Sequence, residues 1–343
     1  MSEPENLTFR KKLAFSAAGL ALLLLLLALA VGIGEAVMRA IGPRSDDQKI
    51  GTKLPDSPRR YGLKVNMTSL QDGVMVRTNS LGFREKEYTV ERTPGVPRIV
   101  VLGDSFTQGL GVDFEDMYVK RLEASLIRSW GPTEVINFGV SGYSTALELA
   151  TLREVAARFR PDLIIVGYVL NDVDLDQPST SVREKTASLP LEAHNELKRN
   201  SLLYRYLAPK MGAVAGLFGG RYAFGKTNYL SAAYSDDAPG WIAARQALLG
   251  IAEEADKLRA GLLVVVFPMI IDFKTYPLGH AHDAVTRFCR ENGIEVIDLL
   301  PRFRREDAAA LTLFLDGHPN ARGHAIFADE IFGALHRAGR PGD

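Results

Sequence analysis

Residue types that can carry out chemistry occur in three short segments that lie far apart in the chain. In chain order they are Gly103-Asp104-Ser105-Phe106, Asn171-Asp172 and Asp316-Gly317-His318-Pro319-Asn320. A serine hydroxyl becomes a nucleophile when a histidine takes its proton and a carboxylate orients that histidine. Histidine suits this role near neutrality because its unperturbed pKa is about 6.5. The residue types therefore predict acyl transfer, with Ser105 as nucleophile, His318 as base and Asp316 as orienting acid.

The reaction also needs hydrogen-bond donors for the negatively charged oxygen that forms when the serine attacks. The side-chain amide of Asn171 can donate to such an oxygen, as can backbone N–H groups at the start of a helix. Gly142 has no Cβ, so a backbone N–H there can approach a substrate closely. Each residue also has a structural interpretation, because Ser105 can cap a helix and Gly142 and Asn171 can form turns. Asp104 and Asp172 are expected to support the site rather than to react.

Structural roles are expected for the single cysteine and for three further histidines, at positions 280, 282 and 324. His324 comes shortly after the candidate base, and we expect it to face the packing side of a helix. His280 and His282 are two residues apart and lack accompanying carboxylates, so a metal site is not expected from them. Cys289 has no partner for an internal disulfide and is expected to be a buried thiol. Neither a metal nor an organic cofactor is therefore expected.

Five apolar runs predict the strands that must position these residues. They are Ile99–Leu102, Glu134–Phe138, Leu163–Val169, Leu262–Phe267 and Glu295–Leu299. Amphipathic stretches at helical spacing lie between them, and this alternation favours a parallel sheet that helices cover on both faces. Ligands of such sheets bind at the carboxyl ends of the strands. Ser105, Gly142 and Asn171 each follow a strand, so the pattern predicts that they meet at one edge.

An uncharged apolar segment near the N-terminus, Leu13 to Gly34, includes six consecutive leucines. As a helix, these residues span about 33 Å, which is enough to cross the hydrocarbon core of a bilayer. Three basic residues directly before the segment, at positions 10–12, favour a cytoplasmic N-terminus and an exported C-terminal body. The favoured prediction is an uncleaved anchor. The alternative is a signal peptide cleaved near Ala30, which lies in a stretch resembling a cleavage site.

The chain is expected to divide into a cytoplasmic tail (1–12), a transmembrane anchor (13–34), a connecting region (35–96) and a catalytic domain (97–340). An insertion at about 173–260 is too long for a structureless loop, so we expect helices that wall or cover the site. Its apolar part, Met211 to Tyr222, can instead touch the membrane or a partner. Within the connecting region, Arg84 follows a turn and is expected to be solvated or ion-paired. Lys plus Arg equals Asp plus Glu, at 41 each, so no nucleic-acid partner is expected.

Taken in order, these blocks resemble the SGNH (GDSL-type) hydrolase superfamily over about residues 98–335. The matching blocks are Gly103-Asp104-Ser105-Phe106, Gly142, Asn171-Asp172, and Asp316 with His318. Two positions depart from the pattern. Val169 stands where members often carry glycine, and Asp316 lies two residues before His318, where many members have a spacing of three. The anchored N-terminus, the Asn79–Arg84 stretch and the Gly323-His324 pair also resemble a bacterial membrane-anchored branch.

The resemblance implies a three-layer α/β/α fold of SGNH or flavodoxin-like type, with a mostly parallel five-stranded sheet after one N-terminal transmembrane helix. It implies an esterase that forms an acyl-serine at Ser105, with His318 and Asp316 in the roles given above and no cofactor. The implied oxyanion donors are the backbone N–H groups of Ser105 and Gly142 and the amide of Asn171. It also implies a single-pass protein of a bacterial inner membrane with a periplasmic catalytic domain, or a secreted protein if cleavage occurs near Ala30.

Three functions stay open at this point. The favoured one is hydrolysis of an ester, such as an O-acetyl group on an envelope glycan, with an acylated carbohydrate or a small ester as the partner. The second is O-acyl transfer in exopolysaccharide or cell-envelope modification, which the same residues would serve. The third is a non-catalytic envelope protein that retains the fold. Its support is the departure at Val169 and the short spacing of Asp316 and His318.

Overall fold

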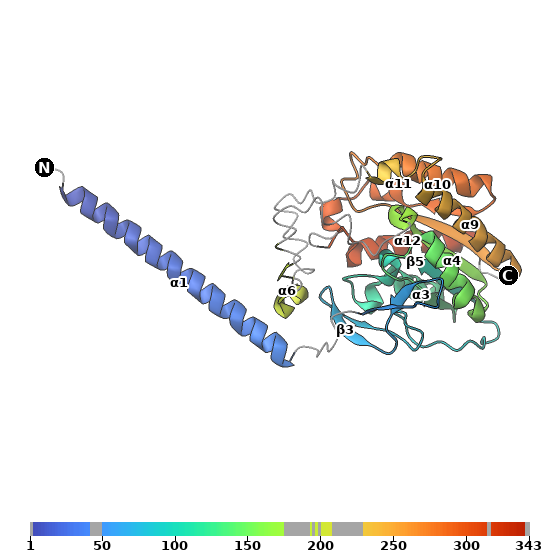
Figure 1. Ribbon diagram of the computed structural model, residues 1–343, viewed down its shortest axis with the longest axis horizontal. Helices are drawn as coiled ribbons and strands as arrows, with labels where there is room; N and C mark the ends of the chain where they lie inside the picture. Colours follow the sequence, from blue (N-terminus) through green and yellow to red (C-terminus); the bar gives the residue numbers. More distant parts are fainter. Residues whose placement is uncertain are drawn as a thin grey trace.

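The computed structural model describes residues 3–41, 50–174, 193, 196–197, 200–207, 229–313 and 317–339. A five-stranded sheet in the order β6-β5-β7-β8-β9 lies at its centre, and all neighbouring strands are parallel (Figure 1). Its strands are β5 (Arg98–Gly103), β6 (Glu134–Asn137), β7 (Leu163–Val169), β8 (Gly261–Phe267) and β9 (Glu295–Asp298). Each of the five predicted runs therefore forms a strand, and the predicted α/β fold is confirmed.

Helices and 3-10 turns connect these strands. The helices are α2 (Ser105–Gln108), α3 (Tyr118–Trp130), α4 (Thr145–Glu154), α6 (Leu202–Leu207), α9 (Pro239–Leu258), α10 (Gly279–Glu291), α11 (Leu300–Phe303) and α12 (Ala321–Ala338). The 3-10 turns are η1 (Phe114–Asp116), η2 (Ala156–Phe159), η3 (Leu170–Val173) and η6 (Ala308–Ala310). Helix α3 packs against α12, and α4 packs against α9. The stretch predicted to be an insertion contains α6 and α9, while its Met211–Tyr222 part lies outside the described residues.

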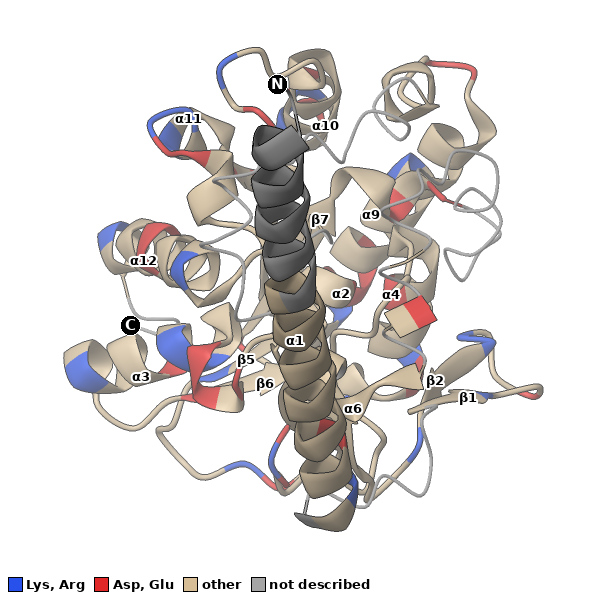
Figure 2. Ribbon diagram, turned by 90° about the vertical axis from the view of Figure 1, so that its left-hand side faces the viewer, with Lys and Arg blue, Asp and Glu red and all other residues tan. Residues whose placement is uncertain are grey.

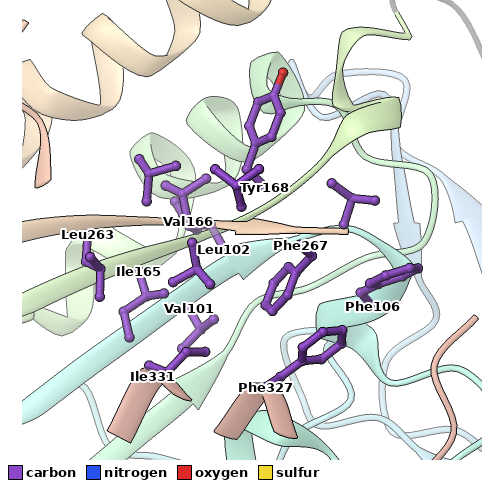
Figure 3. Close-up of a cluster of buried hydrophobic side chains, with 14 of the residues drawn as sticks. Val101, Leu102, Phe106, Ile165, Val166, Tyr168, Leu263, Phe267, Phe327 and Ile331 are labelled. Atoms are coloured by element: carbon purple, nitrogen blue, oxygen red, sulfur yellow. The ribbon is translucent and has the colours of Figure 1, made fainter. Parts of the chain in front are cut away.

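Both faces of the sheet are apolar because helices cover both. Strands β5 and β7 are buried along their whole length. Figure 3 shows Val101 and Ile165 on the face that meets Ile331 of α12, while Leu102 and Val166 point to the opposite face. A strand that is covered on both sides shows an uninterrupted apolar run in its sequence rather than an alternation. This is why the strands could be recognised from composition.

The strand order places two of the candidate residues at one crevice. The chain passes from β5 outward to β6 and then returns to the other side of β5 to form β7. Ligands of open α/β sheets bind where the order reverses in this way, at the carboxyl ends of the strands. Ser105 directly follows β5 in α2, and Asn171 follows β7 in η3. The topology therefore brings the two residues to neighbouring strand ends.

The N-terminal segment forms one long helix, α1 (Glu3–Ile41), which extends away from the body in Figure 1. The 22-residue segment of this helix from Gly19 to Ala40 is long and apolar enough to cross a membrane. None of these residues is buried against the body. In Figure 2, most of the described part of this helix is tan, the colour of residues other than Lys, Arg, Asp and Glu. By length and composition, this helix is suited to be a membrane anchor or a signal sequence.

Residues 50–96 form two small antiparallel sheets beside the main one. Strand β1 (Gly51–Lys53) pairs with β2 (Tyr61–Leu63), and β3 (Thr68–Gln71) pairs with β4 (Val74–Arg77). Beyond these sheets, Phe83 is 1% exposed and packs edge-on against Phe138, with the ring centroids 4.9 Å apart. Part of the segment predicted to be a connection thus contributes to the core of the catalytic body.

Candidate active site

Ser105 lies at the first position of α2, directly after strand β5. The carboxylate of Asp104 caps this short helix, because its Oδ1 accepts a hydrogen bond of 2.9 Å from the N–H of Phe106. The Ser105 side chain is largely buried, with 6% of the residue exposed. A helix start presents unpaired N–H groups, which favour negative charge nearby. The turn therefore holds the hydroxyl beside donors that an oxyanion can use.

Three glycines, at the end of β5, just after β6 and within β7, fit closely around Thr107 of α2 and form a cradle for this helix. A Cβ on Gly103 would lie 2.1 Å from Thr107 Oγ1, and a Cβ on Gly167 would lie 2.7 Å from the same atom. A Cβ on Gly139 would lie 2.7 Å from Thr107 Cβ. The Thr107 hydroxyl also shares a 2.8 Å hydrogen bond with the Tyr118 hydroxyl. Because only glycine fits at these three positions, the helix is fixed close to the sheet.

The predicted base and the predicted nucleophile, His318 and Ser105, are in contact although 213 positions separate them in the chain. The Nε2 atom of His318 lies 2.9 Å from Oγ of Ser105. The histidine backbone is held by a hydrogen bond from the N–H of Leu313 to its carbonyl, at 2.8 Å. Asn320 then caps α12 by accepting from two backbone N–H groups. The structure thus brings together the serine and histidine that the sequence singled out, and Asp316 lies outside the described residues.

Asn171 and Asp104 connect the two strand ends directly. The Asn171 amide donates a 3.2 Å hydrogen bond to Oδ2 of Asp104, which also lies 3.2 Å from Oγ of Ser105. A side-chain amide carries two N–H donors. One of them is engaged by Asp104, which leaves the other as a candidate donor to a substrate oxygen. Burial raises the pKa of Asp104, while the N–H of Phe106 and the nearby His318 act in the opposite direction.

The loop that carries Gly142 is attached to α2 by side-chain hydrogen bonds. Asn137 donates to the carbonyl of Thr107 at 2.9 Å and accepts from the N–H of Gly139 at 2.8 Å. The side chain of Gln108 accepts from the N–H of Ser141 at 2.6 Å. Gly142 follows with a φ of 78°, a conformation that favours glycine. These bonds fix the loop relative to the helix that carries Ser105.

Arg84 differs from its sequence interpretation as a solvated or ion-paired side chain. It is 1% exposed, and its guanidinium donates to three backbone carbonyls shortly after Ser105. Nη2 donates to the carbonyl of Val112 at 2.7 Å, and Nη1 donates to those of Gly109 and Gln108. The last carbonyls of a helix lack partners within it, so a buried guanidinium is a suitable cap. Phe83, the buried aromatic residue directly before it, is a sequence signal that could have revealed this burial.

Two acidic side chains lie buried beneath the site, and only Asp172 was singled out in the sequence. Asp172 and Glu148 are each 1% exposed. Asp172 Oδ2 accepts from the N–H of Val169 at 3.1 Å, whereas its Oδ1 and both Glu148 oxygens have no hydrogen-bond partner in the described part of the chain. Burial raises the pKa of both groups well above their ordinary values, and repulsion adds to this, from Asp104 on Glu148 and from Glu148 and Asp104 on Asp172. Glu148 shares the inward face of α4 with Thr145 and Leu152, a spacing that could have revealed it.

The other histidines that the structure describes have partners outside the contact with Ser105. His324 is fully buried, as expected from the sequence, and its Nδ1 accepts from the N–H of Tyr118 at 3.1 Å. Burial lowers the pKa of His324 to about 3, so the ring is neutral. His282 lies 2.7 Å from Asp298, and no cluster of metal-ligating side chains occurs among the described residues. The Cys289 thiol is buried, and this burial raises its pKa to about 12.

A family model described as the GDSL-like Lipase/Acylhydrolase family matches residues 101–326, about two thirds of the chain. The chain belongs to this family. The matched stretch begins at the end of β5 and ends within α12, so it contains Ser105, Gly142, Asn171 and His318. Both the family membership and the contact between Ser105 and His318 are typical of an ester hydrolase of the GDSL type.

Individual relatives of this GDSL-like chain are distant. Esterase TesA of Pseudomonas aeruginosa is 28% identical over 114 residues, which are 33% of this chain and 57% of that esterase. The crystal structure of TesA matches with 14% identity and a TM-score of 0.42, over 70% of this chain and 98% of that chain. The acetyl xylan esterase AlAXEase matches with 17% identity and a TM-score of 0.42, over 69% and 99%. At these sequence identities and TM-scores, neither structure indicates the substrate of this chain.

Proposed function

We propose that this chain is a serine esterase that works through an acyl-serine intermediate at Ser105. The observation that carries the proposal is the 2.9 Å contact between His318 Nε2 and Ser105 Oγ at the carboxyl end of the sheet. In the first step, Oγ attacks the acyl carbon while Nε2 takes the hydroxyl proton. The histidine then returns that proton to the departing alcohol. Water repeats the sequence, so the acyl group leaves as a carboxylic acid.

The oxyanion of each tetrahedral intermediate is stabilised in this proposal by three donors. These are the backbone N–H groups of Ser105 and Gly142 and the free N–H of the Asn171 amide. The arrangement is supported by the attachment of the Gly142 loop to α2 and by the Asn171 contact with Asp104. Such donors act most strongly where water is excluded, because the local dielectric is low. Asp316 is proposed to orient His318 and to stabilise its charged form.

The proposed substrate is an O-acyl group, such as an O-acetyl ester, on a glycan outside the cytoplasm. The support is the apolar stretch of α1 with three basic residues directly before that stretch, at positions 10–12, which favours an inner-membrane anchor and an exported body. The proposal predicts acetate release when the full-length protein is given an acetylated polysaccharide. If acyl groups instead accumulate on an added glycan acceptor, the chain is an acyltransferase that uses the same residues.

Substitution of Ser105 tests the reaction itself. We expect Ser105→Ala to lower turnover of p-nitrophenyl acetate by the full-length protein by at least about 10³-fold, because the nucleophile is lost. A serine-reactive fluorophosphonate should label the wild type and leave this variant unlabelled. Ser129→Ala, which removes an exposed serine on α3, is the matched control. Unlabelled, inactive wild-type protein would instead indicate a non-catalytic envelope protein.

A further inference from the structure

The end of the apolar helix α1 is joined to helix α6, which belongs to a distant part of the sequence. The carboxylate of Glu35 accepts hydrogen bonds from the Ser201 hydroxyl at 2.8 Å and from the N–H groups of Leu202 at 3.2 Å and Leu203 at 3.1 Å. These N–H groups are at the start of α6, where no partner within the helix is available. Glu35 therefore caps α6 from another helix.

Two further contacts strengthen this joint. Arg39, one turn beyond Glu35, forms a 2.8 Å ion pair with it and donates a 3.0 Å hydrogen bond to the carbonyl of Asn200. Leu203 packs so closely on Gly34 that a Cβ there would lie 2.9 Å from its Cδ2 atom. The adjacent residues Gly34 and Glu35, and Arg39 one turn later, thus all contact the same short segment. Figure 1 shows α6 between α1 and the catalytic body.

The position of this joint along α1 coincides with the end of the apolar stretch. Leu13 to Gly34 carries no charge, and Glu35 is the first ionisable residue after it. A carboxylate is costly inside hydrocarbon, so Glu35 marks where the helix leaves the bilayer when α1 spans it. Helix α6 is bonded to this residue and must lie at the same level. That level is the boundary between lipid and water.

The side chains of α6 suit such a boundary. The helix has the sequence Leu-Leu-Tyr-Arg-Tyr-Leu, and Tyr206 and Leu207 are 38% and 41% exposed. Leu197, shortly before it, is 46% exposed. Tyrosine is enriched where proteins meet the headgroup region, because its ring is apolar and its hydroxyl is polar. Exposed leucines beside it can enter the outer acyl chains.

We propose that α6, together with Leu197, docks on the surface of the lipid bilayer in which α1 is anchored. Glu35 and Arg39 act as the joint that holds α6 at the membrane exit of α1. The same interval of sequence begins just after Asn171, so one oxyanion donor is linked through the chain to a membrane-docked helix. The catalytic body is thereby held at the membrane by two attachments rather than by a single tether. This inference does not depend on the esterase reaction.

A tryptophan placed on α6 reports directly on lipid contact. The full-length Tyr206→Trp protein is reconstituted in phosphatidylcholine vesicles, with or without bromine on the acyl carbons nearest the headgroup. Leu249→Trp on α9 is the matched control, because Leu249 is also 38% exposed. We expect bromine to quench the fluorescence contributed by Trp at position 206 at least about twofold more than that contributed by Trp at position 249. The reason is that a residue at the membrane interface lies close to the brominated carbons. Equal quenching at the two positions overturns the proposal.

A second variant tests the joint. Glu35→Ala in the Tyr206→Trp background removes the acceptor of three hydrogen bonds, so quenching at position 206 should fall toward the control level. Unchanged quenching would overturn the role of Glu35. Intact mass establishes that α1 is present, and thermal melting establishes that each variant is folded. If Tyr206→Trp does not fold, Leu207→Trp serves as the reporter with the same expected result.

Discussion

Arg84 donates a hydrogen bond to the carbonyl of Gly109, so an arginine from outside the main sheet caps the short helix that carries Ser105. The guanidinium is buried, and its two terminal nitrogens reach three carbonyls between positions 108 and 112. Burial lowers its pKa to about 10, which still leaves it charged at neutrality. A fixed cation at the end of α2 therefore limits how far this helix can move.

Replacing Arg84 should reduce turnover more than substrate binding. In Arg84→Lys a single ammonium cannot reach all three carbonyls, so buried acceptors lose their partners at a cost of roughly 2–4 kcal/mol. We expect kcat for p-nitrophenyl acetate to fall about tenfold or more with KM little changed, because the nucleophile is less well positioned. Urea unfolding gives the stability, and Arg128→Lys on the exposed surface of α3 is the control. A loss of stability with wild-type kcat would limit Arg84 to a structural role.

Removing the Asn171 amide should act on the chemical step. Asn171→Ala is expected to lower kcat by about 10²–10³-fold, the usual effect of losing one oxyanion donor. The variant should still be labelled by a fluorophosphonate, although more slowly, because Ser105 and His318 are retained. Steady-state kinetics check the prediction. A higher KM with an unchanged kcat would show that the amide binds the substrate without stabilising the oxyanion.

The buried Glu148 should make the protein less stable as the pH rises. Its raised pKa means that the folded state holds a proton that the unfolded state loses above the ordinary value of 4.5. Stability is therefore greatest below that value and falls as the pH rises toward the folded-state pKa. Glu148→Gln cannot ionise, so its melting temperature should vary less between pH 5 and 8 and should exceed that of the wild type at the upper end of this range. Glu291→Gln, on the surface, should behave as the wild type does.

His324 should make the protein less stable as the pH falls, which is the opposite of the effect expected from Glu148. Its folded-state pKa of about 3 lies below the ordinary value of 6.5. The stability that it contributes is present above pH 6.5 and is lost as the pH falls toward 3, because the unfolded chain then binds the proton more readily. His324→Asn keeps an acceptor for the N–H of Tyr118 and cannot be protonated. Thermal melts between pH 7 and 4 should therefore be flatter for this variant, and a slope equal to that of the wild type would contradict the assignment.

The sheet and the residues at its strand ends could be predicted from the sequence, because doubly covered strands show continuous apolar runs. The burial of Arg84 and Glu148 was missed, because charged side chains are usually exposed and their burial depends on contacts between distant segments. Arg84 requires the fold of residues 50–96 on the body before its carbonyl partners come within reach. Glu148 lay on a helical face that also carries apolar residues, and only its spacing hinted at burial. The α1–α6 joint depends on residues 161 or more positions apart, which no local pattern reveals.

The cradle around Thr107 constrains the ways in which this enzyme can evolve. Any side chain at the three glycines would push α2 outward and carry the reactive hydroxyl away from its base. Variants that accept bulkier esters must therefore gain space from the loops that follow the strands rather than from the sheet beneath α2. Differences in substrate preference are thus expected to arise in these loops, while the three glycines stay as they are.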